Sequence, residues 1–248
     1  MKNVLLVVAT NRAMDSRTQS CMNAVRMAGA AQLITEGSSD VAIARNISLS
    51  MAVRTMEMHP DRDVALFVDD DMVFSVEQAA ALCVYVAEKG VAASAVYSTS
   101  IGEVAANSEL APTAGKWLAG FGFLAVPRAA LFAMAERVPK FQWKNGQDLY
   151  CFTDSALHEI QGVTRWVGED YWFCYQLGGV DLLPIAVGHL KTIPLFASDE
   201  TLQKIAAGTP LDVGEPEPFR VETAPGEGVN VKQERRAASK RRGRNLNA

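Results

Sequence analysis

The sequence lacks the features that mark membrane-spanning, disulfide-rich and zinc-binding proteins. It has no run of about 18 apolar residues without a charge, so we expect no transmembrane helix and no integral membrane segment. Its four cysteines are far apart and form no CxxC pair: Cys21, Cys83, Cys151 and Cys174. This spacing argues against a zinc site and against a disulfide framework, and it predicts reduced thiols in a cytoplasmic protein.

Charge is distributed unevenly along the chain. The 248 residues carry a net charge of −4. Residues 229–248 contain seven Lys and Arg residues against one Glu, a net charge of +6, so the remainder carries −10. The basic stretch 232–244 on an acidic body predicts contact with an anionic partner, such as DNA, a membrane surface or a surface polysaccharide. A solvated tail without a partner explains the same composition equally well.

Apolar segments in the first half of the chain predict the fold class. Buried strands are expected at residues 3–10, 31–37, 64–68 and 91–98, and helices at 15–31, 41–58 and 75–90. This alternation implies an α/β, Rossmann-like fold with a mainly parallel central sheet flanked by helices. In such sheets, ligands bind beyond the carboxyl ends of the strands.

The second half of the chain has a less regular pattern. Strands are expected at 117–128 and 180–191 and helices at 129–138 and 167–179, while residues 143–161 look irregular. Beyond about Ser198, Pro, Gly and Glu dominate the composition. We therefore expect a folded domain at 1–197 and an extended C-terminal segment at 198–248.

Three carboxylates, Asp69, Asp70 and Asp71, directly follow the expected strand 64–68. Alternate side chains of a strand share a face, so Asp69 and Asp71 are expected to converge while Asp70 points elsewhere. Two convergent oxygen donors suit Mg²⁺ or Mn²⁺, particularly where phosphate oxygens complete the coordination. A solvated, Asp-rich turn is the structural alternative.

A second acidic pair, Glu169 and Asp170, opens the expected helix 167–179. Carboxylates in a first turn favour the helix dipole, which is a purely structural explanation. The aromatic residues that follow are expected to hold the pair near a buried cleft, where a carboxylate can act as a general base. His189 follows an apolar strand; such a histidine is more often structural, but beside carboxylates its imidazole would suit Mn²⁺.

Two further features admit alternative explanations. Gly120 and Gly122 flank Phe121, but a third glycine is missing and a strand follows, so this is not a dinucleotide-binding motif. We expect these glycines to let the backbone approach a ligand closely. Arg45, on the expected helix 41–58, is either an ordinary surface residue or a contact to a diphosphate or a base.

Five segments, in order along residues 1–197, resemble the GT-A class of nucleotide-sugar glycosyltransferases, more narrowly its compact bacterial and phage members: DVAIARN, ALFVDDDMVF, GFGFLAVPR, GEDYWFC and VGH. The resemblance implies transfer of a sugar from a UDP- or GDP-sugar, with UDP favoured, to an acceptor hydroxyl with inversion. It implies that Asp69, Asp71 and His189 bind Mn²⁺ or Mg²⁺. It also implies that Asp170, with Glu169 beside it, deprotonates the acceptor.

The resemblance extends to the substrate contacts. It implies a nucleotide site formed by Thr10, Arg12, Asp40, Arg45, Asp69 and Asp70. The donor sugar and the acceptor would lie against Gly120, Phe121, Gly122 and Trp143. Together with the basic tail, the resemblance to phage members makes a hydroxymethylated base of phage DNA the expected acceptor, and a surface polysaccharide or lipid-linked glycan is the alternative.

Two other protein classes share part of this pattern. A sugar-nucleotide nucleotidyltransferase also combines an α/β sheet with metal-binding aspartates, but the segment ATNRAMDSRTQS after the first strand lacks the glycine of its usual signature. A non-enzymatic binding module would require both acidic motifs and His189 to be independent structural accidents. A glycosyltransferase is therefore the function that the sequence predicts.

Overall fold

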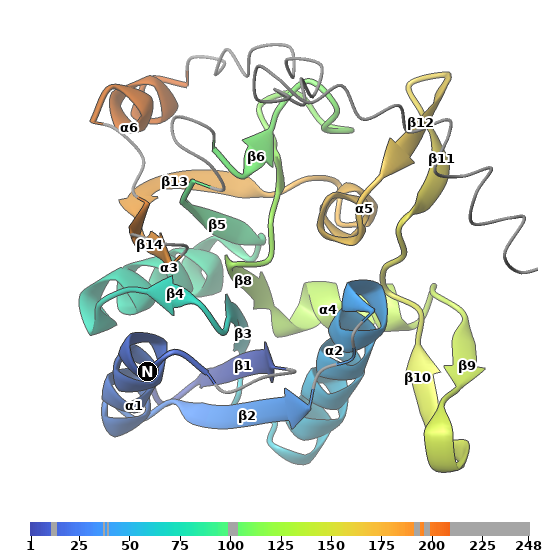
Figure 1. Cartoon of the computed structure of the whole chain (residues 1–248), viewed down its shortest axis with the longest axis horizontal. Helices are drawn as coiled ribbons and strands as arrows, with labels where there is room; N and C mark the ends of the chain where they lie inside the picture. The colour runs from blue at the N-terminus through green and yellow to red at the C-terminus, as the bar shows by residue number, and fades with distance from the viewer. Residues whose placement is uncertain are drawn as a thin grey trace, which may run out of the picture. The chain divides into compact units, whose positions relative to one another are not determined.

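The strands that the apolar segments predict assemble into one central sheet. A computed structural model describes residues 1–10, 14–36, 38, 40–98, 104–190, 194–195 and 199–208. The sheet consists of β1 (Val4–Thr10), β2 (Ala31–Glu36), β3 (Val64–Asp69), β5 (Ala93–Val96), β8 (Phe123–Pro127) and β13 (Asp181–Ala186). Its order is β13-β5-β8-β3-β1-β2 (Figure 1). Every pair is parallel except those of β8, which runs antiparallel to β3 and β5, so the predicted mainly parallel sheet is confirmed.

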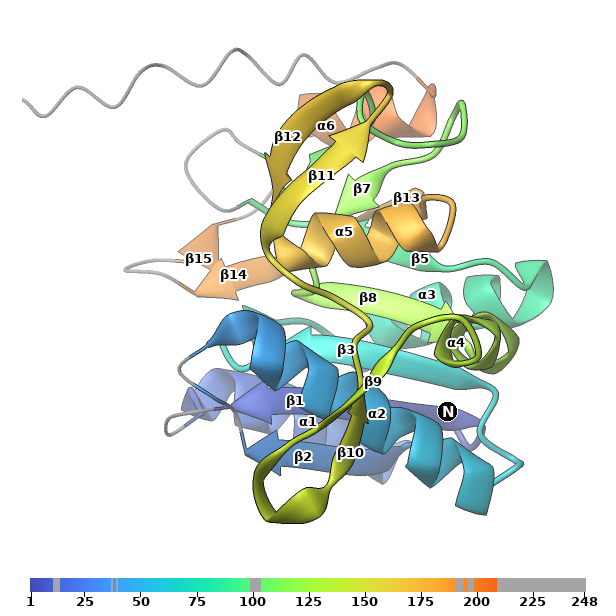
Figure 2. The same ribbon diagram turned by 90° about the vertical axis from the view of Figure 1, so that its right-hand side faces the viewer.

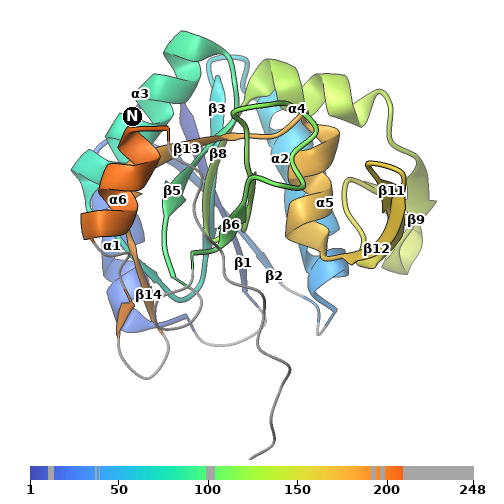
Figure 3. The ribbon, with the colours of Figure 1, turned by 90° about the horizontal axis from the view of Figure 1, so that it is seen from above.

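Helices cover both faces of the sheet (Figure 3). On one face lie α1 (Ser16–Met27) and α3 (Val76–Lys89), whose buried side chains share a core cluster with alternate residues of β1 and β3. On the other face lie α2 (Val41–Met58), α4 (Arg128–Ala135) and α5 (Glu169–Gln176), which share a second cluster with the intervening residues. The strands are buried on both faces, as their continuous apolar sequence requires. The fold is α/β and compatible with the Rossmann-like class.

Local capping signals explain why α2 and α3 begin and end where predicted, whereas α1 ends at Met27, before the predicted residue 31. Asp40 caps α2, and its carboxylate accepts a hydrogen bond from the Ile43 amide at 3.1 Å. Ser75 and Gln78 form the capping box of α3. Gly90 ends that helix with φ of 67°, a left-handed conformation that favours glycine.

The segment predicted to be irregular, 143–161, contains parts of two β-hairpins (Figure 2). The first pairs β9 (Lys140–Gln142) with β10 (Asp148–Tyr150) around the short 3₁₀ helix η1 (Lys144–Gly146), and the second pairs β11 (Ala156–Ile160) with β12 (Val163–Val167). The prediction was wrong here because the hairpins are largely exposed and lack the apolar run of a buried strand. Contacts with helices stabilise them instead: the His158 ring stacks on Trp172 of α5 at 3.6 Å.

Both long strands predicted in the second half are interrupted. The first is divided at Gly120–Gly122 into β7 (Leu118–Ala119), which pairs with β6 (Ala106–Asn107), and β8. The second is divided into β13 and β14 (Gly188–Leu190), which joins β4 (Met72–Val73) and β15 (Pro194–Leu195) in a small separate sheet. This small sheet places His189 opposite Met72, immediately after the acidic triplet.

Helical structure is present past the predicted domain boundary at residue 197. Helix α6 (Asp199–Ala206) packs against β13 and buries Ile205. Residue contacts divide the chain into Met1–Val213 and Gly214–Ala248, and all described residues belong to the first unit. The boundary is therefore later than the composition indicated. Across this described part, no helix has the length and apolar character needed to cross a membrane.

Candidate active site

Polar side chains from four parts of the chain meet at the carboxyl edge of the parallel strands. Asp69 is the last residue of β3, and Tyr97 directly follows β5. The first turns of α2 contribute Arg45, and the first turn of α5 contributes Asp170. The sequence therefore predicted correctly that the acidic triplet lies at the sheet edge where ligands of α/β proteins bind.

The three carboxylates of the triplet have three different partners. Strand β3 ends at Asp69, and Asp70 and Asp71 form the turn into β4. The side-chain alternation of a strand does not extend through a turn, so the alternation that predicted convergence of Asp69 and Asp71 does not apply here. The partners are Arg45 Nη1 at 2.6 Å from Asp69, Thr10 Oγ1 at 2.8 Å from Asp70, and His189 Nε2 at 3.3 Å from Asp71.

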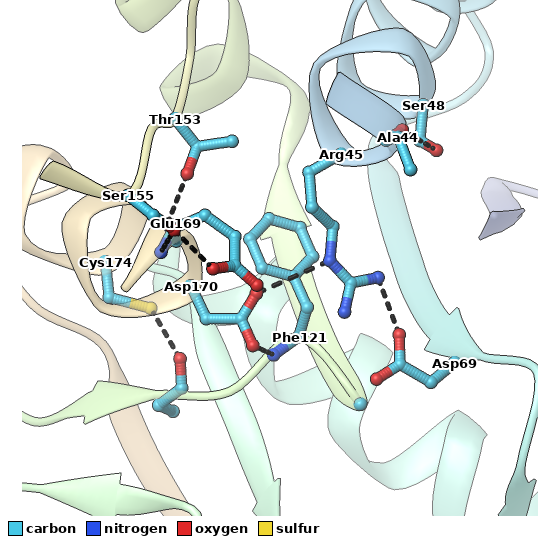
Figure 4. Close-up of polar contacts among 12 residues, drawn as sticks. Ala44, Arg45, Ser48, Asp69, Phe121, Thr153, Ser155, Glu169, Asp170 and Cys174 are labelled. Atoms are coloured by element: carbon cyan, nitrogen blue, oxygen red, sulfur yellow. Dashed lines mark hydrogen bonds and ion pairs between the residues drawn. The ribbon is translucent and has the colours of Figure 1, made fainter. Parts of the chain in front are cut away.

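Arg45 bridges the two acidic motifs of the sequence (Figure 4). Its Nη1 lies 2.6 Å from Asp69 Oδ1, its Nε lies 3.4 Å from Asp170 Oδ1, and its guanidinium lies over the Phe121 ring at 4.8 Å. Only 8% of Arg45 is exposed, so this is no ordinary surface arginine. Burial by itself would lower the pKa of Arg45, but the attraction of Asp69 and Asp170 outweighs burial and raises it. The residue is a permanent cation shared by two carboxylates.

The Asp170 carboxylate has an unusually high proton affinity. Burial is the main cause and raises its pKa from 3.8 to about 6, while Arg45 and the Phe121 amide, which donates to Oδ2 at 3.2 Å, lower it. Oδ1 is buried and, among the described residues, makes no hydrogen bond of good geometry. The side chain as a whole keeps 25% exposure, so a second molecule can reach it. A reachable carboxylate with this pKa has the properties of a general base near neutral pH.

Tyr97 is a site residue that the sequence did not reveal. Its hydroxyl accepts a hydrogen bond from the Gly122 amide at 2.8 Å, and its ring contacts His189 edge-on at 5.6 Å. A Cβ atom added to Gly120 would lie 2.2 Å from the Tyr97 hydroxyl oxygen and 3.5 Å from Asp170 Oδ2. Burial, Asp69 and Asp170 all raise the pKa of Tyr97, so the phenol stays neutral. The only sequence signal for Tyr97 was the pair Gly120 and Gly122, because two glycines this close together suggest that another group packs directly against the backbone.

The glycine pair therefore has a different role from the one predicted. A Cβ atom on Gly122 would lie 2.6 Å from the Tyr97 ring, so both glycines make room for this side chain rather than for a ligand. Phe121, between them, is only 1% exposed and lies beneath Arg45. Its side chain therefore supports Arg45, and its backbone amide donates to Asp170.

The contact between Asp71 and His189 has the chemistry of a cation site. The Nδ1 atom of His189 lies 3.0 Å from the Ser98 carbonyl, which can only accept, so Nδ1 carries the proton of the neutral ring. The Nε2 lone pair then faces the Asp71 carboxylate at 3.3 Å, an arrangement that needs a proton or a metal ion between the two atoms. The backbone contact to Nδ1 also orients the ring as metal-binding histidines are usually oriented.

The donor set fits a divalent cation only in part. Asp71 and His189 lie together, but Asp69, the third predicted ligand, pairs with Arg45 instead. Within the described ranges, no group of three or more His, Cys, Asp and Glu side chains is placed to hold a metal ion. The structure thus offers two neighbouring donors, a carboxylate and an imidazole, of the kinds that Mn²⁺ accepts.

Several other predicted residues have structural roles or lie elsewhere. Asp40 caps α2, and Glu169 accepts a hydrogen bond from the Ser155 hydroxyl at 2.9 Å. Trp143 stands at the tip of the β9–β10 hairpin, next to Lys144. Figures 1 and 2 both place this hairpin tip well away from α5, the helix that carries Asp170. Arg12 and the basic stretch 232–244 lie outside the described residues.

Comparisons with known proteins leave the function open. No protein-family model and no curated protein sequence matches the chain. Among solved structures, the fold is similar to that of A197 from STIV, with 13% identity and a TM-score of 0.49. The likeness covers 79% of this chain and 95% of that one, and at this score it carries no argument about function.

Proposed function

We propose that this chain is a metal-dependent glycosyltransferase of the GT-A type that uses a nucleotide-diphosphate sugar as donor. One observation carries the proposal. Tyr97 contacts His189 on one side. On the other side it packs against Gly120, which lies close to the Asp170 carboxylate. Donors suited to a divalent cation and a carboxylate suited to accept a proton are thus held on either side of one buried side chain. A diphosphate leaving group and an acceptor hydroxyl require these two functions side by side.

The metal end of the site is formed by Asp71 and His189. These residues would hold Mn²⁺ or Mg²⁺, with phosphate oxygens of the donor as natural further ligands. When bound, the cation neutralises the charge that develops on the diphosphate leaving group. The Ser98 carbonyl keeps the histidine proton on Nδ1, which leaves Nε2 available for the metal.

The other end of the site accepts the proton. Asp170 takes it from the acceptor hydroxyl, while Arg45 and the Phe121 amide hold the carboxylate in place. This base is separate from the proposed metal ligands, an arrangement that favours direct attack by the acceptor and inversion at the anomeric carbon. Thr10 and Asp70, which are hydrogen-bonded to each other beside Asp69, are proposed to contact the nucleotide.

The test is donor turnover with and without metal. Purified protein is incubated with UDP- and GDP-sugars in Mn²⁺ or in EDTA, and release of the nucleoside diphosphate is measured. We expect metal-dependent turnover that is lost in Asp71→Ala and falls as the pH drops through about 6, where Asp170 becomes protonated. Asp61→Asn is the matched control, because Asp61 is an exposed carboxylate paired with Arg62. If neither donor binds or turns over, and Asp71→Ala changes nothing, the proposal fails.

The proposed acceptor is a hydroxymethylated base in DNA. The proposal rests on the composition of the tail, in which seven basic residues between 232 and 244 stand against one Glu. Deleting residues 229–248 is expected to weaken DNA binding and to flatten its salt dependence, as measured by fluorescence anisotropy between 50 and 200 mM salt. Unchanged DNA affinity would favour the alternative acceptors, a surface polysaccharide or a lipid-linked glycan, which the same turnover assay can test.

A further inference from the structure

Helix α5, which carries Asp170, begins without a capping side chain of its own. Its N-cap residue is Gly168, which makes no side-chain hydrogen bond. The cap comes from an earlier segment: Ser155 Oγ accepts a hydrogen bond from the Glu169 amide at 3.2 Å and donates to the Glu169 carboxylate at 2.9 Å. The segment 153–155 therefore determines where the first turn of α5 lies.

This segment is in turn held by α2 through Asn46. The Asn46 Nδ2 donates to the Thr153 carbonyl at 2.8 Å, and the Thr153 amide donates to Asn46 Oδ1 at 3.1 Å. The Thr153 hydroxyl then donates to the Glu169 carbonyl (Figure 4). Asn46 is only 2% exposed, and the backbone of Thr153 satisfies both the donor and the acceptor of its side-chain amide. Hydrogen bonds thus run without a break from α2 to the start of α5.

Both ends of this connection adjoin the site. Asn46 directly follows Arg45 on α2, and Glu169 directly precedes Asp170 on α5. Segment 153–155 therefore links the two helices that carry Arg45 and Asp170, whose side chains lie 3.4 Å apart. A substitution that loosens this segment would retain both side chains, Arg45 and Asp170, but would no longer hold them at this distance.

We propose that Asn46 is a positioning residue for Asp170: its side-chain amide fixes Thr153 and thereby holds the start of α5 at the distance from α2 that the Arg45–Asp170 contact requires. Only the role of Asp170 as a base rests on the proposed function. The positioning itself follows from the hydrogen bonds and can be measured without any substrate.

The sign of the expected effect follows from the groups that surround Asp170. Arg45 is the strongest charge that lowers its pKa, so moving Arg45 away raises that pKa further above 3.8. Two other charged groups face it, Asp69 from β3 and Glu169 from α5, and both oppose its ionisation. Burial raises the pKa values of Tyr97, Tyr171 and Cys174, so these neighbours stay neutral and do not replace Arg45. Loosening segment 153–155 would also admit water to Asp170, which lowers its pKa. A quarter of this side chain is already exposed, so we expect the lost attraction of Arg45 to outweigh the added hydration and the titration of Asp170 to shift to higher pH.

The test is an NMR titration of the Asp170 carboxyl carbon in ¹³C-labelled full-length protein, with the resonance assigned through Asp170→Asn. The serine side chain of Asn46→Ser is too short to reach both the carbonyl and the amide of Thr153. In this variant the pKa of Asp170 should rise by about half a pH unit or more. Thr153→Val keeps the two hydrogen bonds between Asn46 and the Thr153 backbone but removes the hydroxyl that bonds to Glu169. It should produce a smaller rise in the pKa of Asp170. Thr153→Ser retains that hydroxyl and should titrate like the natural protein.

Ser50→Ala is the matched control. Ser50 lies one turn further along α2, is fully buried, and accepts a hydrogen bond from the Tyr150 amide at 2.9 Å. Removing the Ser50 hydroxyl also costs a hydrogen bond that α2 makes to the backbone, but this bond joins α2 to β10 and not to the segment that caps α5. We expect Ser50→Ala to lower the melting temperature without moving the pKa of Asp170.

The outcomes separate this inference from the proposed function. An unchanged pKa of Asp170 in folded Asn46→Ser overturns the inference; if that variant does not fold, an unchanged pKa in Thr153→Val does so. If donor turnover exists, Asn46→Ser should lower kcat several-fold and shift the acidic limb of the pH profile upward, with KM for the donor unchanged. If the pKa shifts but no sugar nucleotide is ever turned over, the proposed function fails and the positioning role stands.

Discussion

Asp71 and Asp170 are the same chemical group at the same edge of the sheet, yet their surroundings give them different chemistry. Asp71 lies 3.3 Å from the imidazole Nε2 of His189, whereas Asp170 lies 3.4 Å from the guanidinium of Arg45. A carboxylate facing a nitrogen lone pair favours a bound cation between the two. A buried carboxylate next to a built-in cation remains ionisable, and its proton affinity is tuned by the balance of burial and attraction. The neighbour, rather than the residue type, separates the proposed metal end of the site from its proposed proton-accepting end.

The largest effect is expected from Asp170→Asn. An amide of nearly the same shape can keep one hydrogen bond to the Phe121 amide but cannot accept a proton. We expect sugar transfer to fall by about 10²- to 10⁴-fold, the usual contribution of a general base. Donor affinity, measured by calorimetry in Mn²⁺, should stay within a few-fold. Equal loss of binding and rate would mean that Asp170 belongs to the donor site and that the contrast with Asp71 is wrong.

Metal binding should depend on Asp71 and not on Asp170. With donor present and Mn²⁺ at about 100 times its dissociation constant, linkage predicts about 2.7 kcal/mol of stabilisation, measured as an increase in Tm that EDTA reverses. Asp71→Asn should abolish this increase, and Asp170→Asn should retain it. The comparison breaks if both variants respond to Mn²⁺ alike.

Asp170 should also make the folding stability depend on pH. Its pKa is about 6 in the folded protein against 3.8 ordinarily, so the folded state binds more protons between these values. The contribution of this group to stability is therefore greatest in acid and is lost as the pH rises from about 4 to about 6. At pH 7, Asp170→Asn should increase the free energy of unfolding by about 1–3 kcal/mol. Urea titrations at pH 4 and pH 7 would measure it, and a less stable variant at pH 7 would contradict the sign.

Gly120→Ala tests the side chain that stands between the two ends of the site. The added Cβ would lie 2.2 Å from the buried Tyr97 hydroxyl, so we expect a loss of about 1–3 kcal/mol in urea unfolding. Tyr97→Phe removes the colliding oxygen. Gly120→Ala should therefore cost less free energy of unfolding in the Tyr97→Phe protein than in the natural one. Strictly additive effects would show that the two residues do not interact.

The smallest effect is expected from Asp40→Ala. This carboxylate caps α2 through the Ile43 amide, and losing such a cap costs about 1 kcal/mol in the free energy of unfolding. Donor affinity should be unchanged, in contrast to the variants at the sheet edge. A clear loss of nucleotide binding in Asp40→Ala would restore the predicted role of Asp40 in the donor site.

Much of the first half of the chain could be predicted because its signals are local. Helix α2 begins at Val41 and ends at Met58 as expected, since Asp40 provides a strong cap, and the capping box of α3 is read directly from Ser75 and Gln78. The hairpins after residue 140 could not be predicted. Their strands are short and half exposed, and each hairpin contacts a helix outside itself: His158 of β11 stacks on Trp172 of α5, and the Tyr150 amide of β10 donates to Ser50 of α2.

The sequence by itself determined the parallel strands, the capped helices and the place of the acidic residues at the carboxyl edge, because apolar runs and caps act over a few neighbouring residues. Only the tertiary structure decided which partner each carboxylate has. It gave Arg45 to Asp69 and Asp170, paired Asp71 with His189, and filled the space above Gly120 with Tyr97. These contacts join residues up to 125 positions apart (Arg45 and Asp170), and their chemistry depends on burial and distance, which no local pattern encodes.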